Sequence, residues 1–355
     1  MHMADALISP AVGGTMWVVT AGLISWCARK VRETRDDSLI PLMGVLGAFI
    51  FTAQMINFSI PVTGSSGHLG GGLILAVMLG PYAAFIVIAS VLTVQALFFA
   101  DGGLLALGCN IFNLGFFPAF IAYPLLYKLI AGKERVGARA WVAAMAAAVL
   151  GLQLGAFGVV LETKMSGISE LPFKTFVLIM QPIHLAIGIV EGLTTATVVA
   201  FVARARPEAL DRLAGSRVDA DSRAASGKQS LWPVLAGLLV VAAVLGGAAS
   251  WFASTHPDGL EWTIAKVTGK EEFRGSTDTV HETLAAVQSK TAFLPDYGFK
   301  GSQEDNASAE HVGTVPEPWP AVKAGTSVSG IVGGCLTLAL VVLIGFALKA
   351  RMKGN

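Results

Sequence analysis

Charged residues are scarce in this chain. Asp, Glu, Lys and Arg make up 14% of its 355 residues, whereas roughly a quarter is usual in a soluble domain. Hydrophobic residues make up 54%, and 40 residues are glycine. A soluble domain of this length cannot bury so much apolar surface, so the composition excludes an ordinary globular protein. It indicates an all-α polytopic membrane protein.

Cysteine is rare too. Cys27, Cys109 and Cys335 lie far apart inside apolar segments, which excludes a disulfide framework and a CxxC metal or redox motif. The net charge of +1 gives no general attraction to nucleic acid. The chain also lacks a GxxxxGK[ST] phosphate loop and an HExxH zinc motif, so it carries no recognisable ATPase or zinc-protease site of its own.

Long apolar runs are plentiful. A helix needs about 20 apolar residues to span a bilayer, and seven runs meet this length: 9–28, 39–58, 104–127, 141–161, 176–203, 231–253 and 327–348. An eighth run, 70–99, is interrupted at its middle by "LGPY" (79–82). It can be one long helix or two shorter ones.

The distribution of basic residues decides between these alternatives. Four short clusters contain 17 of the 25 basic residues: 29–35, 128–139, 204–228 and 349–353. Such clusters mark cytoplasmic segments. All four lie on one side of the membrane only if 70–99 crosses twice, as 70–80 and 82–99. The prediction is nine segments in the plasma (inner) membrane, with the N-terminus outside and the C-terminus in the cytoplasm.

Segment 70–80 is unusually short. It spans about 16 Å at 1.5 Å per residue, roughly half of the hydrocarbon thickness. Such a segment is tolerated only where it is buried or reaches a cavity. Three glycines at 70–72 leave its backbone unshielded. This combination points to a binding site.

The N-terminus offers metal-binding chemistry. Residues 1–28 lack the basic-before-apolar order of a signal peptide, so the first helix is expected to be retained. Met1-His2 then lies on the same face as loop 59–72, which contains His68. The α-amine, the His2 amide and the His2 Nδ1 can form fused chelate rings, and His68 can supply a fourth nitrogen. Square-planar nitrogen coordination suits Ni²⁺ or Cu²⁺. The alternative is that His2 is an accident of the chain start and His68 an ordinary surface residue.

Other polar residues are weaker candidates. We expect Asp101 on the external face, where it either orients a ligating histidine or caps a helix. Asn110 either satisfies groups near the site or joins helices. His184 and Glu191 share one helix face, and ionisable residues inside a membrane are functional candidates, although a structural role fits them equally.

Histidines also occur in the predicted external loop. His256 and His281 are either surface residues or residues that deliver metal to the site.

Four ordered stretches carry a family resemblance: "MHMADALISPAVGG", "SSGHLGGGLILAVMLGPYAAF", "VQALFFADGGLLALGCNIFNLG" and "HLAIGIVEGLTTA". They resemble the substrate-specific component of energy-coupling factor (ECF) nickel/cobalt transporters, the NikM/CbiM family. "HPDGLEW" and "LPDYGFKG" are similar to motifs of the PDGLE domain in the accessory N-type component. The resemblance implies a seven-helix domain (1–203), a cytoplasmic linker (204–230) and a two-helix domain (231–355) with an external loop (254–326).

The resemblance also implies a function. Ni²⁺ or Co²⁺ would be bound in square-planar form by Met1, His2 and His68, as transported ligand, with no tightly bound cofactor. The implied partners are an ECF transmembrane coupling component, cytoplasmic ABC ATPase subunits and membrane lipids, with no nucleic acid. Two alternatives remain at this point. One is an intramembrane enzyme that uses His184, Glu191 and Asp101, and the other is a membrane metal sensor. The sequence does not choose nickel over cobalt.

Overall fold

The computed structural model describes residues 2–34, 39–61, 63–134, 136–169, 171–205, 232–269, 278–300 and 319–350. Met1, most of the predicted linker and parts of the predicted external loop lie outside the described residues.

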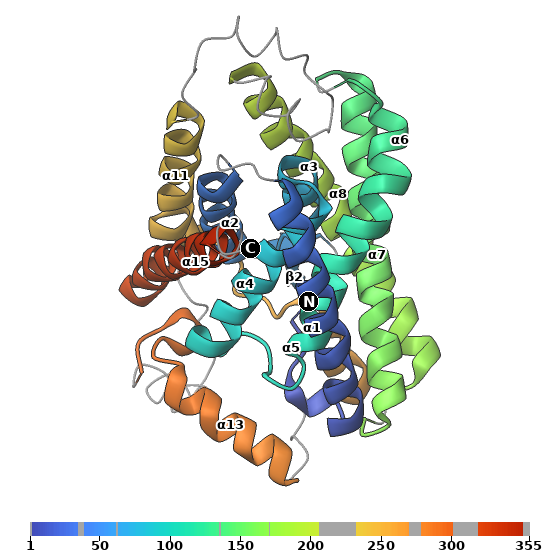
Figure 1. The fold of residues 1–355 in the computed structure, drawn as a ribbon. Coiled ribbons are helices and arrows are strands. Elements are labelled where there is room, and N and C mark those ends of the chain that lie inside the picture. The colour runs from blue at the N-terminus through green and yellow to red at the C-terminus, as the bar shows by residue number, and fades with distance from the viewer. Residues whose placement is uncertain are drawn as a thin grey trace, which may run out of the picture.

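Helices dominate the described part of the chain (Figure 1). Six of its helical spans are long and apolar enough to cross a membrane: α1 (Pro10–Thr34), α4 (Pro81–Phe99), the continuous span Leu107–Ala131, α7 (Ala138–Ser166), α8 (Phe173–Ala205) and α15 (Ala324–Ala350). Two shorter apolar helices are α2 (Leu39–Gln54) and α11 (Trp232–Gly247). Together with α3 (Gly72–Leu79), these helices match the nine predicted segments. The predicted fold class, an all-α polytopic membrane protein, is confirmed.

The run 70–99 is divided, as predicted. Helix α3 ends at Leu79, Gly80 has φ 78°, and Pro81 is the first residue of α4. Proline suits the first turn of a helix, where its missing N–H has no intrahelical acceptor, but it would break a continuous helix. All eight residues of α3 are buried, so the short segment is enclosed by protein.

The span Leu107–Ala131 differs from the plain helix that we predicted over 104–127. It consists of α5 (Leu107–Ile111), the π-helix η2 (Phe112–Tyr127) and α6 (Lys128–Ala131). Pro118 and Pro124 lie inside η2. Each removes one backbone donor and crowds the preceding turn, so a regular α-helical hydrogen-bond ladder is not available there.

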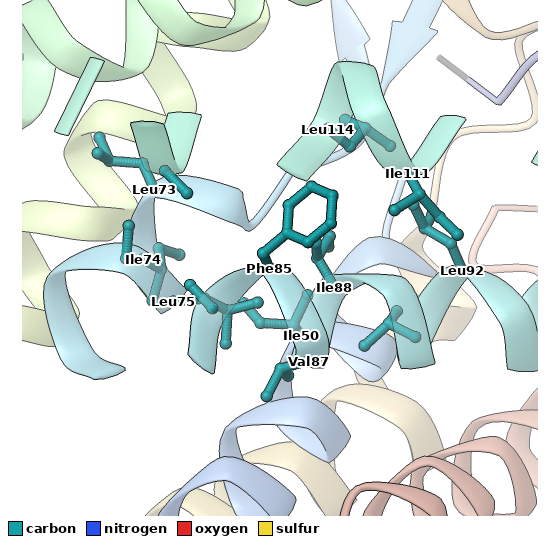
Figure 2. Packing of buried hydrophobic residues seen from close by; sticks show 14 of the residues in the cluster. Ile50, Leu73, Ile74, Leu75, Phe85, Val87, Ile88, Leu92, Ile111 and Leu114 are labelled. Carbon is teal, nitrogen blue, oxygen red and sulfur yellow. The ribbon is translucent and has the colours of Figure 1, made fainter. Parts of the chain in front are cut away.

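Helix α4 lies at the centre of the fold, where it contacts α1, α2, α3, α5, η2 and α15. Figure 2 shows Phe85 and Ile88 of α4 pointing toward Leu114 of η2, with Ile50 of α2 and Ile74 of α3 close by. All five side chains are buried. The core therefore fixes α3 against α4 and holds the loop that precedes α3.

The two C-terminal helices, α11 and α15, pack against α2. Between them, the predicted external loop is partly helical rather than irregular, with η3 (Ala249–Phe252), α12 (Gly259–Thr268), α13 (Thr279–Thr291) and η4 (Pro295–Tyr297). Helix α12 contacts α8, and α13 contacts α4. In Figure 1, α13 lies across the end of the bundle near α5. The C-terminal part of the chain therefore packs directly on the first part.

A small antiparallel hairpin, absent from the prediction, precedes α3. Strand β1 (Phe58–Ile60) pairs with β2 (Ser65–Gly67), with Phe58 opposite Gly67 and Ile60 opposite Ser65. Strands this short carry too few residues for an alternating hydrophobic pattern. His68 follows β2 directly, so the hairpin fixes the position at which the irregular stretch 68–71 begins.

Candidate metal centre

Two of the three predicted ligand residues lie side by side. The ring centroids of His2 and His68 are 4.8 Å apart, with an angle of 39° between the ring planes. Both are buried, with 7% of the His2 side chain and 8% of His68 exposed. Helices α1 and α2 both lie between these residues in the sequence, and the fold brings the two rings together. Met1, the third predicted ligand residue, lies outside the described residues.

His68 has the properties of a metal ligand. Its Nδ1 lies 3.0 Å from the carbonyl oxygen of Leu69. A carbonyl only accepts, so Nδ1 carries the hydrogen and Nε2 the lone pair. Burial lowers the pKa of the His68 imidazole well below its ordinary value. The ring is therefore neutral at physiological pH, as metal binding requires.

Asp101 contacts the other histidine. His2 Nδ1 lies 2.6 Å from Asp101 Oδ1, and the Tyr297 hydroxyl donates to Asp101 Oδ2. Burial alone would raise the pKa of Asp101, but the interactions with His2 and Tyr297 hold it below the ordinary value. The His2 Nε2 atom is buried and has no hydrogen-bond partner among the described residues.

The backbone next to His2 is fixed by Asn110. The Met3 N–H donates to Asn110 Oδ1 over 2.8 Å, and Asn110 Nδ2 donates to the Met3 carbonyl oxygen over 3.2 Å. The Gly103 N–H donates to the same carbonyl over 2.9 Å. Asn110 was predicted either to satisfy groups near the site or to join helices, and in the structure it binds the main chain of Met3, next to His2.

Close approach of the chain requires glycine at position 103. A Cβ atom there would lie 1.9 Å from Asp5 Oδ1 and 2.4 Å from the Asp5 nitrogen. Asp5 Oδ1 accepts from the Ala106 N–H over 2.9 Å. The "DGG" sequence therefore gives the N-terminal segment room to lie against the turn that follows α4.

The C-terminal part of the chain also binds this segment. His281 Nε2 lies 3.1 Å from the Asp5 carbonyl oxygen and 3.0 Å from that of Ile8. Gln288 Nε2 donates to the carbonyl oxygens of Ala96 and Gly102 over 2.9 and 2.8 Å. His281 is buried, so it is not an ordinary surface residue.

The "HPDGLEW" motif packs on the other ligand-bearing loop. Ser66 donates from its backbone N–H to the Pro257 carbonyl oxygen and from Oγ to that of His256, over 2.8 Å each. Asp258 caps α12 in a capping box with Glu261. The motif therefore contacts the chain at Ser66, two residues before His68.

Glu191 supports the His68 loop from within the bundle. Its Oε2 atom accepts from the Gly70 N–H over 2.7 Å. His184 lies on the same helix, but its Nδ1 atom contacts the Met180 carbonyl oxygen, 2.8 Å away. The two residues that share a helix face therefore have different partners.

The described residues contain no group of three or more His, Cys, Asp or Glu side chains that could hold a metal ion. A site at His2 and His68 therefore needs main-chain nitrogen or a residue outside the described ranges. The residues His184, Glu191 and Asp101, proposed together for an enzyme, each bind different groups in the structure.

Tyr297, His281 and Gln288 support the site but were not identified from the sequence as supporting residues. Tyr297 lies in "LPDYGFKG", a stretch that the sequence marks only by its resemblance to a motif of the PDGLE domain. A contact across 196 residues leaves no local pattern that would pair it with Asp101.

The sequence matches the profiles of two known families. The family profile CbiM, described as "Cobalt uptake substrate-specific transmembrane region", matches residues 2–209, and the PDGLE domain profile matches residues 232–350. The chain belongs to the CbiM family. It is a transporter component and not an enzyme, so the intramembrane-enzyme alternative is not supported.

Relatives in this family carry names for both metals. A putative fused nickel transport protein NikMN of Archaeoglobus fulgidus is 32% identical over 348 residues, which is 98% of each chain. The fused nickel transport protein NikMN of Rhodobacter capsulatus is 31% identical over 59% of this chain and 64% of its own length. The cobalt transport protein CbiM of Geobacter sulfurreducens is 28% identical over 80% of this chain and 82% of its own.

Solved structures share the fold over more than half of the chain. A truncated transition metal transporter is 29% identical with a TM-score of 0.52, over 58% of this chain and 99% of its own. A second transition metal transporter has the same TM-score at 28% identity, over 59% of this chain and 95% of its own.

Proposed function

We propose that this CbiM-family chain is the substrate-capture component of an importer for Ni²⁺ or Co²⁺. The metal enters from outside and binds four nitrogens in a plane: the Met1 amine, the His2 amide, the His2 imidazole and the His68 imidazole. The observation that carries the proposal is the contact between the buried His2 and His68 rings. Imidazole and amide nitrogens in square-planar arrangement suit Ni²⁺.

Chelation would change the role of Asp101. The fused chelate uses His2 Nδ1, the atom that contacts Asp101 in the structure. A half-turn of the ring about Cβ–Cγ moves Nδ1 away from Asp101 and brings Nε2 to the former position of Cε1, next to it. Asp101 would then accept from Nε2–H and orient a ligating histidine, as outer carboxylates commonly do.

We further propose the membrane arrangement and the partners. The N-terminus lies outside, the C-terminus lies in the cytoplasm, residues 1–203 form the metal-binding domain, and 204–230 link it to the PDGLE part. An ECF coupling component and ABC ATPase subunits supply the energy, because the sequence carries no phosphate loop of its own. The family membership and the fused relative named for nickel transport support this assignment.

An N-terminal extension tests the site. Two residues, Gly-Ser, placed before Met1 convert the amine into an amide, so calorimetry with Ni²⁺ should show loss of binding. The matched control carries Gly-Ser after Asn355 and should bind as the unmodified protein does. His68→Ala should also lose binding. Native Ni²⁺ affinity in the N-terminally extended protein would contradict the proposed ligand set.

A further inference from the structure

The stretch that carries His68 is irregular backbone inside a helical bundle. Residues 68–71 belong to neither β2 nor α3, and α3 itself is completely buried. These residues are buried, and buried backbone N–H and C=O groups require partners within the protein. In this stretch partners come from side chains on two helices, α8 and α2.

The Gly70 residue is held on both sides. Glu191 Oε2 of α8 accepts from its N–H over 2.7 Å, and Gln54 Nε2 of α2 donates to its carbonyl oxygen over 2.8 Å. Gln95 of α4 donates to Gln54 Oε1 over 3.0 Å. Glu191 is 1% exposed, Gln54 4% and Gln95 0%. These contacts leave the loop little freedom to move.

One peptide group connects Glu191 with His68. The Gly70 N–H that binds Glu191 and the Leu69 C=O that binds His68 Nδ1 belong to the same planar unit. The carboxylate, the peptide and the imidazole therefore form a continuous hydrogen-bonded chain. In such chains each bond polarises the next, and the ring orientation and its Nε2 lone pair are fixed together.

Glycine at position 70 allows this arrangement. A Cβ atom there would lie 2.9 Å from Glu191 Oε2 and 3.0 Å from Leu152 Cδ2. A side chain at this position would require the carboxylate or Leu152 to shift.

We infer that Glu191 is a positioning residue for metal capture, which holds the His68 imidazole in its ligating orientation through the Leu69–Gly70 peptide. The inference rests on the proposed function, because it assumes that His68 binds the metal. It differs from a purely structural role for Glu191, in which the carboxylate would only stabilise the start of α3. A structural role predicts a loss of thermal stability without a matching loss of metal affinity.

The test is calorimetry of the full-length protein with Ni²⁺ alone, combined with thermal unfolding. Glu191→Ala should raise the Kd for Ni²⁺ by about 10- to 100-fold, the range known for residues that orient a metal ligand by hydrogen bonding. Glu191→Gln retains an acceptor oxygen and should keep a Kd close to the wild-type value. The matched control is Glu162→Ala, because Glu162 is a buried carboxylate on α7 that binds Asn113. This control should lower the Tm but leave the Kd unchanged.

The outcomes separate the two proposals. If His68→Ala binds Ni²⁺ normally, the proposed function is wrong. If His68→Ala loses binding while Glu191→Ala keeps the wild-type Kd, the inference alone is wrong. If Glu191→Ala cannot be purified in folded form, Glu191→Asp decides, because its shorter side chain withdraws the carboxylate from the Gly70 N–H. A raised Kd in that variant supports the inference, and an unchanged Kd overturns it.

Discussion

The hydroxyl of Tyr297 donates a hydrogen bond to Asp101, whose other carboxylate oxygen contacts His2. Tyr297 belongs to the part of the chain matched by the PDGLE profile, and Asp101 and His2 to the part matched by the CbiM profile. A single carboxylate therefore connects the C-terminal part with a proposed metal ligand.

Tyr297→Phe should weaken Ni²⁺ binding by about tenfold. The variant removes only the hydroxyl, and a hydrogen bond to a charged group contributes about 1.5–3 kcal/mol. Calorimetry measures the change, and Tyr82→Phe at the opposite end of α4 should bind normally. An unchanged Kd in Tyr297→Phe would show that the contact does not support the site.

Gly103→Ala should disrupt the N-terminal segment. The added methyl group would lie 1.9 Å from Asp5 Oδ1, so the N-terminal segment would have to move away from the turn that follows α4. We expect a marked loss of Ni²⁺ affinity. The control is Gly14→Ala on α1, where a Cβ atom would meet nothing within 4 Å. Equal behaviour of the two variants would argue against the close approach described above.

Asn110→Ala should reduce both stability and metal affinity. It leaves the buried Met3 N–H without its acceptor, at a cost of about 1–3 kcal/mol, and frees the backbone beside His2. Asn113→Ala, which removes the contact with Glu162, should lower the Tm without changing the Kd for Ni²⁺. If both variants lower the affinity equally, Asn110 has no special role at the site.

The contact made by His281 should depend on pH. Burial alone would lower the pKa of His281, but hydrogen bonds with Asp278 and with the carbonyl oxygens of Asp5 and Ile8 raise it above the ordinary value. Asp278 and the Asp5 carboxyl are the charged groups that face it. Since the folded pKa exceeds the unfolded one, the stabilisation is fully present below about pH 6.5 and is lost as pH rises through the folded value.

Thermal unfolding of the protein and of His281→Gln across about pH 5.5 to 8.5 checks this sign, because that range brackets the ordinary histidine pKa. The difference in Tm should be largest at the acidic end and shrink toward the alkaline end. A difference that grows with pH would contradict the assignment of a raised pKa.

Much of the fold could be predicted because it depends on local patterns and on counting charges. The break at Gly80-Pro81 followed from the need for an even number of crossings, and the structure places it there. The same count placed His2 and His68 on one face of the membrane, and in the structure their rings lie together. The π-helix could not be predicted. Pro118 and Pro124 indicate that the helix is irregular, but they do not show which irregular form it adopts.

The supporting contacts of the site were beyond sequence reasoning for a different reason. Glu191 was singled out as a buried ionisable residue, but its partner is the backbone of Gly70, which has no side chain to suggest a pairing. His281 likewise binds two carbonyl oxygens. Contacts of a side chain with a distant main chain leave no complementary residue in the sequence.

The C-terminal part binds the main chain of the N-terminal segment, of the end of α4 and of the turn after it, because His281 and Gln288 contact four carbonyl oxygens. Such contacts depend on the spacing of the carbonyl oxygens along the backbone rather than on the identity of the side chains. A substitution of Ala4, the exposed residue of the stretch from Ala4 to Ile8, should leave them intact, whereas one inserted residue would shift the carbonyl oxygens away from their donors. The main-chain contacts therefore constrain the length of this segment in addition to the constraints on its side chains.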